Sequence, residues 1–184
     1  MRSSPEKALL LLAAYAASVT AQSCPDIHVF GARETTVSPG FGSAGALVNM
    51  IINAHPGATS EAITYPACGG QASCGGVQYG DSARQGTSAV ASAVNSFNQR
   101  CPNTKLVLVG YSQGGQIMDN ALCGGGDGGA GISSTAVPIS SSAVSKIAAA
   151  IFLGDPRWQS GLSYGVGTCR AGGVSFPFSV PPSA

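Results

Sequence analysis

The sequence predicts an α/β protein with a doubly wound parallel sheet, and three observations lead to this prediction. The chain has 184 residues, of which 44% are hydrophobic and 9% charged, so it can bury one core and is not intrinsically disordered. Apolar extended runs alternate with amphipathic helical segments. Residues 105–111 (KLVLVGY) form a continuous apolar run, which is typical of a parallel strand buried on both faces.

Two strands and two helices are expected in the first part of the domain. Residues 26–32 (DIHVFGA) form an extended apolar run that ends at a turn-prone glycine. Residues 41–57 repeat apolar side chains at helical spacing before a His-Pro-Gly stop. Residues 62–65 (AITY) indicate a short strand, closed by Pro66. A second helix is expected from about residue 81 to residue 100, with apolar side chains on one face.

The second part continues the alternation after the buried run at 105–111. A sharp turn and a helix through residue 122 should follow it, and then a glycine-rich loop. A further helix near residues 142–149 and a strand at 151–156 (IFLGDP) complete the expected order. Strands joined in this way by helical crossovers give a parallel sheet with helices on both faces.

The charge balance excludes nucleic acid as a partner. Nine Lys and Arg stand against eight Asp and Glu, and no basic block is present to neutralise a row of phosphates. No cysteine pair has zinc-ligand spacing, so we expect no metal and no cofactor. A nearly neutral protein suits an uncharged polymeric substrate.

The N-terminus resembles a signal peptide. Arg2 and Lys7 precede an apolar run at 8–17, which is too short to span a bilayer, and small residues favour cleavage before Gln22. We therefore expect residues 1–21 to be removed from a secreted protein without a membrane anchor; the alternative is an anchor or a buried first helix. Six cysteines agree with the oxidising export route, although their spacing alone does not decide how they pair.

The candidate catalytic motif is the G-x-S-x-G pentapeptide at residues 110–114 (GYSQG), between the buried strand and a helix. A nucleophile on such a turn is lifted above the sheet, and the glycines remove side chains that would collide there. Ser112 is therefore the expected nucleophile. The alternative is a glycine-rich turn whose serine only caps the helix.

Acyl transfer at Ser112 also needs donors for the oxyanion of the tetrahedral intermediate. The backbone N–H of the following residue, Gln113, is one expected donor. A second donor should come from the loop after the first strand, where Thr35 or Thr36 is available. The alternative is that these threonines only form a turn.

Three segments carry a family resemblance: SCPDIHVFGARETT at 23–36, YPACGGQASCGG at 65–76 and LVGYSQGGQIMDNALCGGGD at 108–127. The chain resembles fungal acetylxylan esterases of the cutinase-like family, carbohydrate esterase family 5, over about residues 23–173. The resemblance implies a three-layer α/β-hydrolase-type fold. It also implies a small secreted serine esterase, expected to be monomeric, that acts on acetylated plant cell-wall polysaccharide by removing acetyl groups from xylan.

The resemblance also assigns individual residues. It makes Ser112 the nucleophile and places Thr35 and Gln113 in the oxyanion hole. It implies two disulfides, Cys24–Cys101 and Cys68–Cys74. The first pairing agrees with the expected order of elements, because both of its cysteines precede strands that should be parallel neighbours.

The histidine that a serine esterase needs is hard to find in this sequence. In this fold the acid and the histidine follow the nucleophile, yet no histidine follows Ser112. His28 and His55 are the only two, and we expect His28 to be a structural residue of the first strand. Asp155 is the best-placed acid by position alone. The resemblance argues against it, because family members bring both residues from a segment that would begin after Gly173.

We therefore expect an incomplete esterase domain at residues 22–173, lacking its C-terminal portion and impaired in activity. Residues 174–184 (VSFPFSVPPSA) show no periodicity and no resemblance to the family. A retained intron with a premature stop explains this tail; a real short isoform is the alternative. Two other functions stay open: a cutinase acting on cutin-like or short-chain esters, and a non-catalytic secreted protein that binds cell walls.

Overall fold

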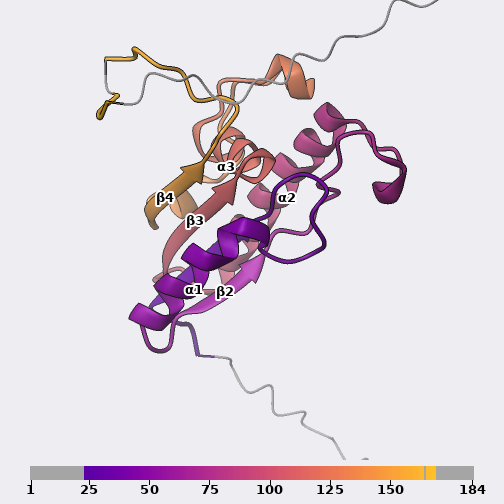
Figure 1. Ribbon diagram of the computed structural model, residues 1–184. Coiled ribbons are helices and arrows are strands. Elements are labelled where there is room, and N and C mark those ends of the chain that lie inside the picture. Colours follow the sequence, from indigo (N-terminus) through magenta and orange to yellow (C-terminus); the bar gives the residue numbers. More distant parts are fainter. Residues whose placement is uncertain (1–22, 164, 169–184) are drawn as a thin grey trace, which may run out of the picture.

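A computed structural model describes residues 23–163 and 165–168, and its centre is a parallel four-stranded sheet (Figure 1). The strand order is β2-β1-β3-β4. The strands are β1 (Ile27–Ala32), β2 (Thr59–Ala62), β3 (Lys105–Tyr111) and β4 (Ile147–Leu153). The predicted α/β class is confirmed, and β3 occupies the expected residues.

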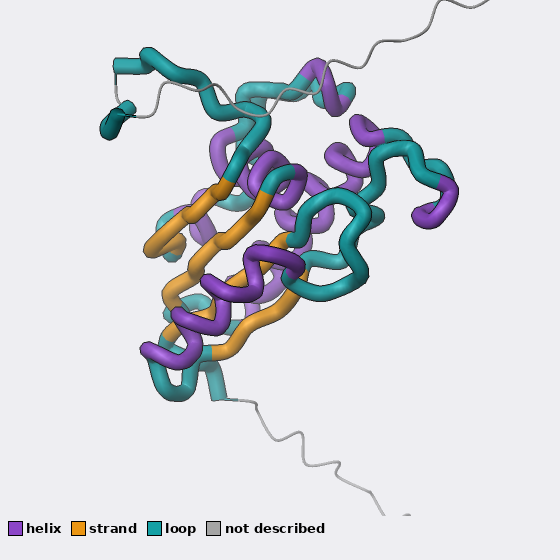
Figure 2. The backbone as a smooth tube through the Cα atoms, in the orientation of Figure 1, coloured by secondary structure: helices purple, strands orange, loops and turns teal. Residues whose placement is uncertain are grey.

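Helices cover both faces of the sheet, which gives three layers (Figure 2). α1 (Gly45–Ala54) lies on one face, whereas α2 (Tyr79–Arg100) and α3 (Gln113–Cys123) pack together on the other. Four short elements lie in the connections: η1 (Gly42–Ala44), η2 (Ala72–Cys74), η3 (Gly128–Ala130) and α4 (Ser141–Val144). Among the helices of the described ranges, none is long and apolar enough to cross a membrane.

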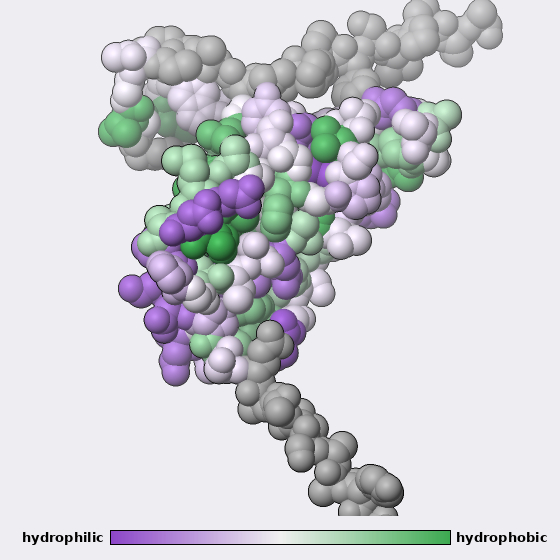
Figure 3. Space-filling view, turned by 60° about the horizontal axis from the view of Figure 1, so that its bottom comes forward, coloured by the Kyte–Doolittle hydropathy of each residue, from purple (hydrophilic) through white to green (hydrophobic). Residues whose placement is uncertain are grey.

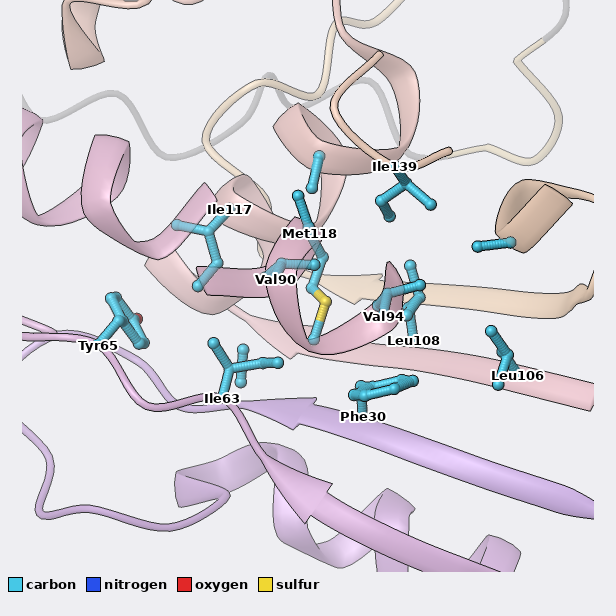
Figure 4. Close-up of a cluster of buried hydrophobic side chains, with 14 of the residues drawn as sticks. Phe30, Ile63, Tyr65, Val90, Val94, Leu106, Leu108, Ile117, Met118 and Ile139 are labelled. Atoms are coloured by element: carbon cyan, nitrogen blue, oxygen red, sulfur yellow. The ribbon is translucent and has the colours of Figure 1, made fainter. Parts of the chain in front are cut away.

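Each face of the sheet has its own apolar core. On one face, Phe30 and Leu108 pack against side chains of α2 and α3, including Val90, Val94 and Met118 (Figure 4). On the opposite face, the alternate residues of the strands pack against α1 in a smaller cluster built on Val29, Val48, Val107 and Val109. Burial on both faces explains why β3 reads as an uninterrupted apolar run.

Two expected boundaries are wrong. The strand expected at 62–65 lies at Thr59–Ala62, because an edge strand pairs through its backbone while its side chains stay partly exposed. The helix expected at 142–149 ends at Val144, and its last three residues belong to β4. Alanines favour a helix there, but pairing with β3 overrides that preference.

The structure contains both disulfides that the resemblance implied. Cys24–Cys101 joins the segments that precede β1 and β3, with 5.5 Å between the Cα atoms, and Cys68–Cys74 closes a short loop. Within the described part of the chain, Cys123 is the only free cysteine. The expected signal peptide at 1–21 and the tail at 174–184 lie outside the described residues.

The order of strands creates a switch point between β1 and β3. From β1 the chain continues to β2 on one side of it, whereas from β3 it continues to β4 on the other. Neighbouring crossovers therefore diverge at the carboxyl ends of β1 and β3, which is where open α/β sheets bind their ligands. Ala32 pairs with Gly110, so the loop after β1 lies next to the turn after β3.

His28 lies in the core at the other half of β1. Its ring is 4% exposed, stacks on Phe97 at 3.9 Å between centroids, and has Nδ1 2.6 Å from the Thr59 hydroxyl. Burial, with a smaller contribution from the Arg100 charge, lowers the pKa of His28 to about 4. The imidazole is therefore neutral in the folded protein at neutral pH.

Acid should destabilise the fold through His28. Its folded pKa lies below the unfolded value of 6.5, so its stabilisation is complete above pH 6.5 and is lost as the pH falls toward 4. A His28→Asn variant keeps a partner for Thr59 and lacks this titration. Denaturant unfolding is measured at pH 7, 5.5 and 4. The difference in free energy of unfolding between wild type and variant should narrow by about 3 kcal/mol as the pH falls from 7 to 4. A gap that stays constant over this range would contradict the assignment.

Candidate active site

Ser112 lies at a strained turn between β3 and α3. Its φ is 52° and its ψ is −120°, a backbone conformation that residues other than glycine rarely adopt. The turn is held by hydrogen bonds, since the Ser112 N–H donates to the Leu153 carbonyl at 2.8 Å and its own carbonyl accepts from Gln116. The side chain is partly exposed and makes no capping hydrogen bond to α3, so the capping alternative is wrong.

The two motif glycines are required by close backbone contacts. A Cβ at Gly110 would overlap the backbone of Gly114, and a Cβ at Gly114 would overlap the carbonyl groups of Ala32 and Arg33. These positions therefore accept no side chain without a shift of the backbone. The second contact also shows that the turn at Ser112 packs directly on the chain leaving β1.

Backbone strain is concentrated in the loops around this turn. Within the described residues, the non-glycine residues with positive φ are Thr36, Ala67 and Ser112. The Thr36 N–H donates to the Ala67 carbonyl at 2.6 Å, so two of the three are bonded to each other. Such strain gathers where a structure must hold a functional geometry, which marks this end of the sheet as the candidate site.

Thr35 and Thr36, the two candidates for the second oxyanion donor, differ in their hydrogen bonds. The N–H of Thr36 is bonded to Ala67 and its hydroxyl to the Thr35 carbonyl. Neither the N–H nor the hydroxyl of Thr35 donates to another described residue. The N–H of Gln113 is the first of α3 and has no partner within its helix. Thr35 and Gln113 therefore keep N–H groups that a ligand could bind, whereas the N–H of Thr36 is already bonded.

The Gln113 side chain has a role that the sequence did not reveal. It is fully buried; its Oε1 accepts from the Ser82 hydroxyl at 3.0 Å, and its Nε2 donates to the Cys68 and Tyr79 carbonyls at 3.3 Å. The Ser82 hydroxyl in turn accepts from the Cys68 N–H. The residue after Ser112 thus ties the turn to the disulfide loop and to α2.

Both histidines lie away from Ser112. His28 pairs in register with Leu106, six residues before Ser112, which at about 3.3 Å per residue is roughly 20 Å along β3. His55 follows the last residue of α1 and lines a cavity with Asp26 and Ile27, at the amino end of β1. The structure therefore places neither imidazole within reach of the serine.

Asp155 is the carboxylate next to the turn. It follows β4, is 8% exposed, and accepts a hydrogen bond from the Arg157 N–H at 2.9 Å. Its Cβ lies 3.5 Å from where a Cβ at Gly115 would be. Burial raises the pKa of Asp155 to about 6, and the nearby Asp119 charge adds to the shift. The position agrees with the expectation from the sequence, but no imidazole stands between this carboxylate and Ser112.

The glycine-rich loop beside the site is fixed by charged side chains. Arg157 donates to the carbonyls of Gly124 and Gly126 and forms an ion pair with Asp119 at 3.3 Å. Asp127 accepts from Gln116 at 2.8 Å and from Asn120 at 2.9 Å. Over the described ranges, no group of three or more His, Cys, Asp or Glu could hold a metal ion.

Comparisons with known proteins show the family of the chain. A family model described as Cutinase matches residues 23–178. Cutinase 11 of Verticillium dahliae is 69% identical over 171 residues, covering 90% of this chain and 58% of the relative. Acetylxylan esterase 2 of Talaromyces purpureogenus is 64% identical over 166 residues, covering 89% of this chain and 71% of the relative. The chain thus spans about three fifths to seven tenths of the length of these relatives.

A solved structure extends the likeness to three dimensions. The catalytic core domain of acetyl xylan esterase from Trichoderma reesei superposes with a TM-score of 0.77 at 62% identity, covering 85% of this chain and 79% of that chain. On this evidence the chain belongs to the cutinase family.

Proposed function

We propose that the chain is the core of a secreted, monomeric serine esterase that removes acetyl groups from acetylated xylan. The observation that carries the proposal is the strained, partly exposed Ser112, on a turn that packs through Gly114 on the chain that leads to Thr35. This packing supports a site in which the N–H groups of Thr35 and Gln113 serve the nucleophile, as acyl transfer requires. The proposal includes neither a cofactor nor a nucleic-acid partner.

The reaction proceeds through an acyl-enzyme. The Ser112 Oγ attacks the acetyl carbonyl carbon while a general base accepts the hydroxyl proton. The N–H groups of Thr35 and Gln113 stabilise the oxyanion that forms. Collapse of this intermediate breaks the ester bond, and the sugar oxygen leaves with the proton from the base. Water then attacks the acetyl-serine, releases acetate and restores the serine hydroxyl.

An uncharged polysaccharide fits the surface and the relatives. The face shown in Figure 3 mixes hydrophilic and hydrophobic side chains, as expected for a chain with 9% charged residues. The Talaromyces and Trichoderma relatives bear the name acetylxylan esterase, which supports xylan as the substrate. A cutinase that acts on longer acyl esters is the second candidate, favoured by the 69% identity to Cutinase 11.

We also infer that the 184-residue chain is a slow enzyme by itself. The described geometry leaves Ser112 without an imidazole to accept its proton, because both histidines lie toward the amino ends of the strands. A serine hydroxyl without a base stays protonated at neutral pH. What remains is the stabilisation of the oxyanion and the positioning of the substrate, which keep only a part of the rate enhancement.

The role of Ser112 is tested by supplying the base. The 184-residue chain should hydrolyse p-nitrophenyl acetate slowly, whereas a chimera extended with the C-terminal segment of the Talaromyces relative should be much faster. In the chimera, Ser112→Ala should lower kcat by at least about 10³-fold. Ser145→Ala, a change at a serine beside α4, is the matched control and should leave kcat unchanged. Full turnover by the Ser112→Ala chimera would remove the serine from its role.

Acyl-chain length separates the two esterase candidates. If acetyl is the natural group, kcat/KM of the chimera should fall at least about tenfold from the acetate to the octanoate p-nitrophenyl ester, since each extra methylene must find apolar surface. Release of acetate from acetylated xylan is measured alongside. A rise in kcat/KM with chain length would favour the cutinase. Firm binding to insoluble xylan with no turnover of any ester would favour the cell-wall-binding alternative.

A further inference from the structure

We propose that Arg33 is a positioning residue that holds the N–H of Thr35 in place for the oxyanion. The proposal rests on the esterase function proposed above. Arg33 is the first residue after β1, and it is 5% exposed. It lies two positions before Thr35 in a loop that contains no helix or strand. Something other than regular hydrogen bonding must therefore give this loop its shape.

The Arg33 side chain supplies that shape through backbone carbonyls. Its Nε donates to the Val37 carbonyl at 2.9 Å, which closes the loop of residues 33–37 on itself. Its Nη2 donates to the carbonyls of Tyr65 at 2.6 Å and Pro66 at 3.3 Å, and these belong to the segment that leads to Ala67. One planar guanidinium thus fixes the far end of the loop against its neighbour.

Tyr65 also donates a hydrogen bond back to Arg33. Its hydroxyl donates to the Arg33 carbonyl at 2.6 Å, and its ring lies 5.0 Å from the Arg33 guanidinium carbon. Arg33 and Tyr65 are therefore bonded in both directions, backbone to side chain. Because the Arg33 carbonyl also packs against Gly114, this pair fixes the near end of the loop against the turn that carries Ser112.

Thr35 lies between these two fixed ends. The Arg33–Glu34 peptide group is restrained on one side through its carbonyl, and the Thr35–Thr36 peptide group is restrained on the other because the Thr36 N–H is bonded to Ala67. An oxyanion donor must be held to well under 1 Å, because hydrogen-bond stabilisation of the transition state depends steeply on distance and angle. Without the guanidinium, the loop beyond Arg33 would be held by the Thr36 bond to Ala67 and by the bonds from Ser43 to the Glu34 carboxylate. Within the described part of the chain, no side chain of residues 33–37 would then tie Val37 to Arg33 or the loop to Tyr65 and Pro66.

The cost of burying Arg33 supports a positional role. Among the described residues, it has no carboxylate within ion-pair distance, and its donors are matched to neutral carbonyls instead. A buried cation without a counter-charge adds little net stability, and apolar side chains of similar volume often serve a core as well. A fold gains from such an arginine chiefly when the shape that it imposes on the backbone is needed.

The experiment compares three variants of the full 184-residue chain. Arg33→Met removes the guanidinium but keeps most of the volume, and Tyr65→Phe removes only the hydroxyl bond to the Arg33 carbonyl. Arg157→Met is the matched control, since Arg157 also donates to backbone carbonyls, but in the loop at Gly124 and Gly126. All assays are run well below the melting temperature of the least stable variant.

The first readout is amide hydrogen exchange, which needs no turnover. Exchange at Thr36, protected by its bond to Ala67, should accelerate at least about tenfold in Arg33→Met and less in Tyr65→Phe. In Arg157→Met it should stay at the wild-type rate while the melting temperature falls. Wild-type exchange at Thr36 in the Arg33→Met variant would overturn the proposal, even if the chain proves to have no esterase activity.

The second readout isolates the oxyanion. The chain's residual hydrolysis of p-nitrophenyl acetate should fall about 10-fold to 100-fold in kcat in Arg33→Met, with KM little changed. The thionoacetate analogue forms a sulfur anion, which accepts N–H hydrogen bonds poorly, so its rate should fall much less. Equal losses on both esters would indicate general structural damage and overturn the proposal. If neither the wild-type chain nor the extended chimera shows turnover above buffer, the proposed function fails, and the exchange experiment alone decides the role of Arg33.

Discussion

The parallel pairing of β1 with β3 is the interaction on which the rest of the structure depends. Its register places Ala32 beside Gly110, so the loop after β1 and the turn after β3 leave the sheet side by side. At the opposite end, Cys24–Cys101 joins the segments that precede the same two strands. The two strands are thus joined covalently at their amino ends, away from the candidate site. At their carboxyl ends, where the candidate site lies, the backbone at Gly114 packs directly on the chain leaving β1. A change in register by one residue would separate the candidate donors from Ser112.

The strain around Ser112 is sustained by polar side chains that bind backbone carbonyls. Thr36, Ala67 and Ser112 each hold a conformation that costs about 1–3 kcal/mol. Two buried side chains oppose that cost by donating to the main chain of neighbouring loops: Arg33 and Gln113. Because these loops form no regular backbone hydrogen bonds of their own, side chains must donate hydrogen bonds to their buried carbonyls. The same bonds that satisfy these carbonyls therefore also hold the shape of the site.

The sequence predicted what depends on local pattern and missed what depends on tertiary contacts. The apolar run of β3, the G-x-S-x-G turn and the His-Pro-Gly end of α1 carry their own signals, and each lies where it was expected. β2 was placed too late because its pairing uses backbone groups of exposed polar residues, and β4 was partly assigned to a helix because alanines are ambiguous. The partners of Arg33 and of the Gln113 side chain left no trace in the sequence, since they are carbonyls supplied by distant segments.

The structure therefore treats two parts of the proposed catalytic site differently: the serine with its oxyanion donors, and the histidine that would accept the serine proton. The proposed nucleophile and both proposed donors are positioned by contacts among residues 31–37, 65–82 and 110–116, all within one disulfide-tied core. None of these contacts involves a histidine, and both histidines belong to the amino ends of the strands, where His28 is neutral and enclosed by aromatic rings. In the proposed mechanism, the oxyanion site is thus preorganised by this core, whatever group accepts the serine proton. Electrostatic preorganisation and proton transfer, which act together in a serine esterase, are structurally separable in this fold.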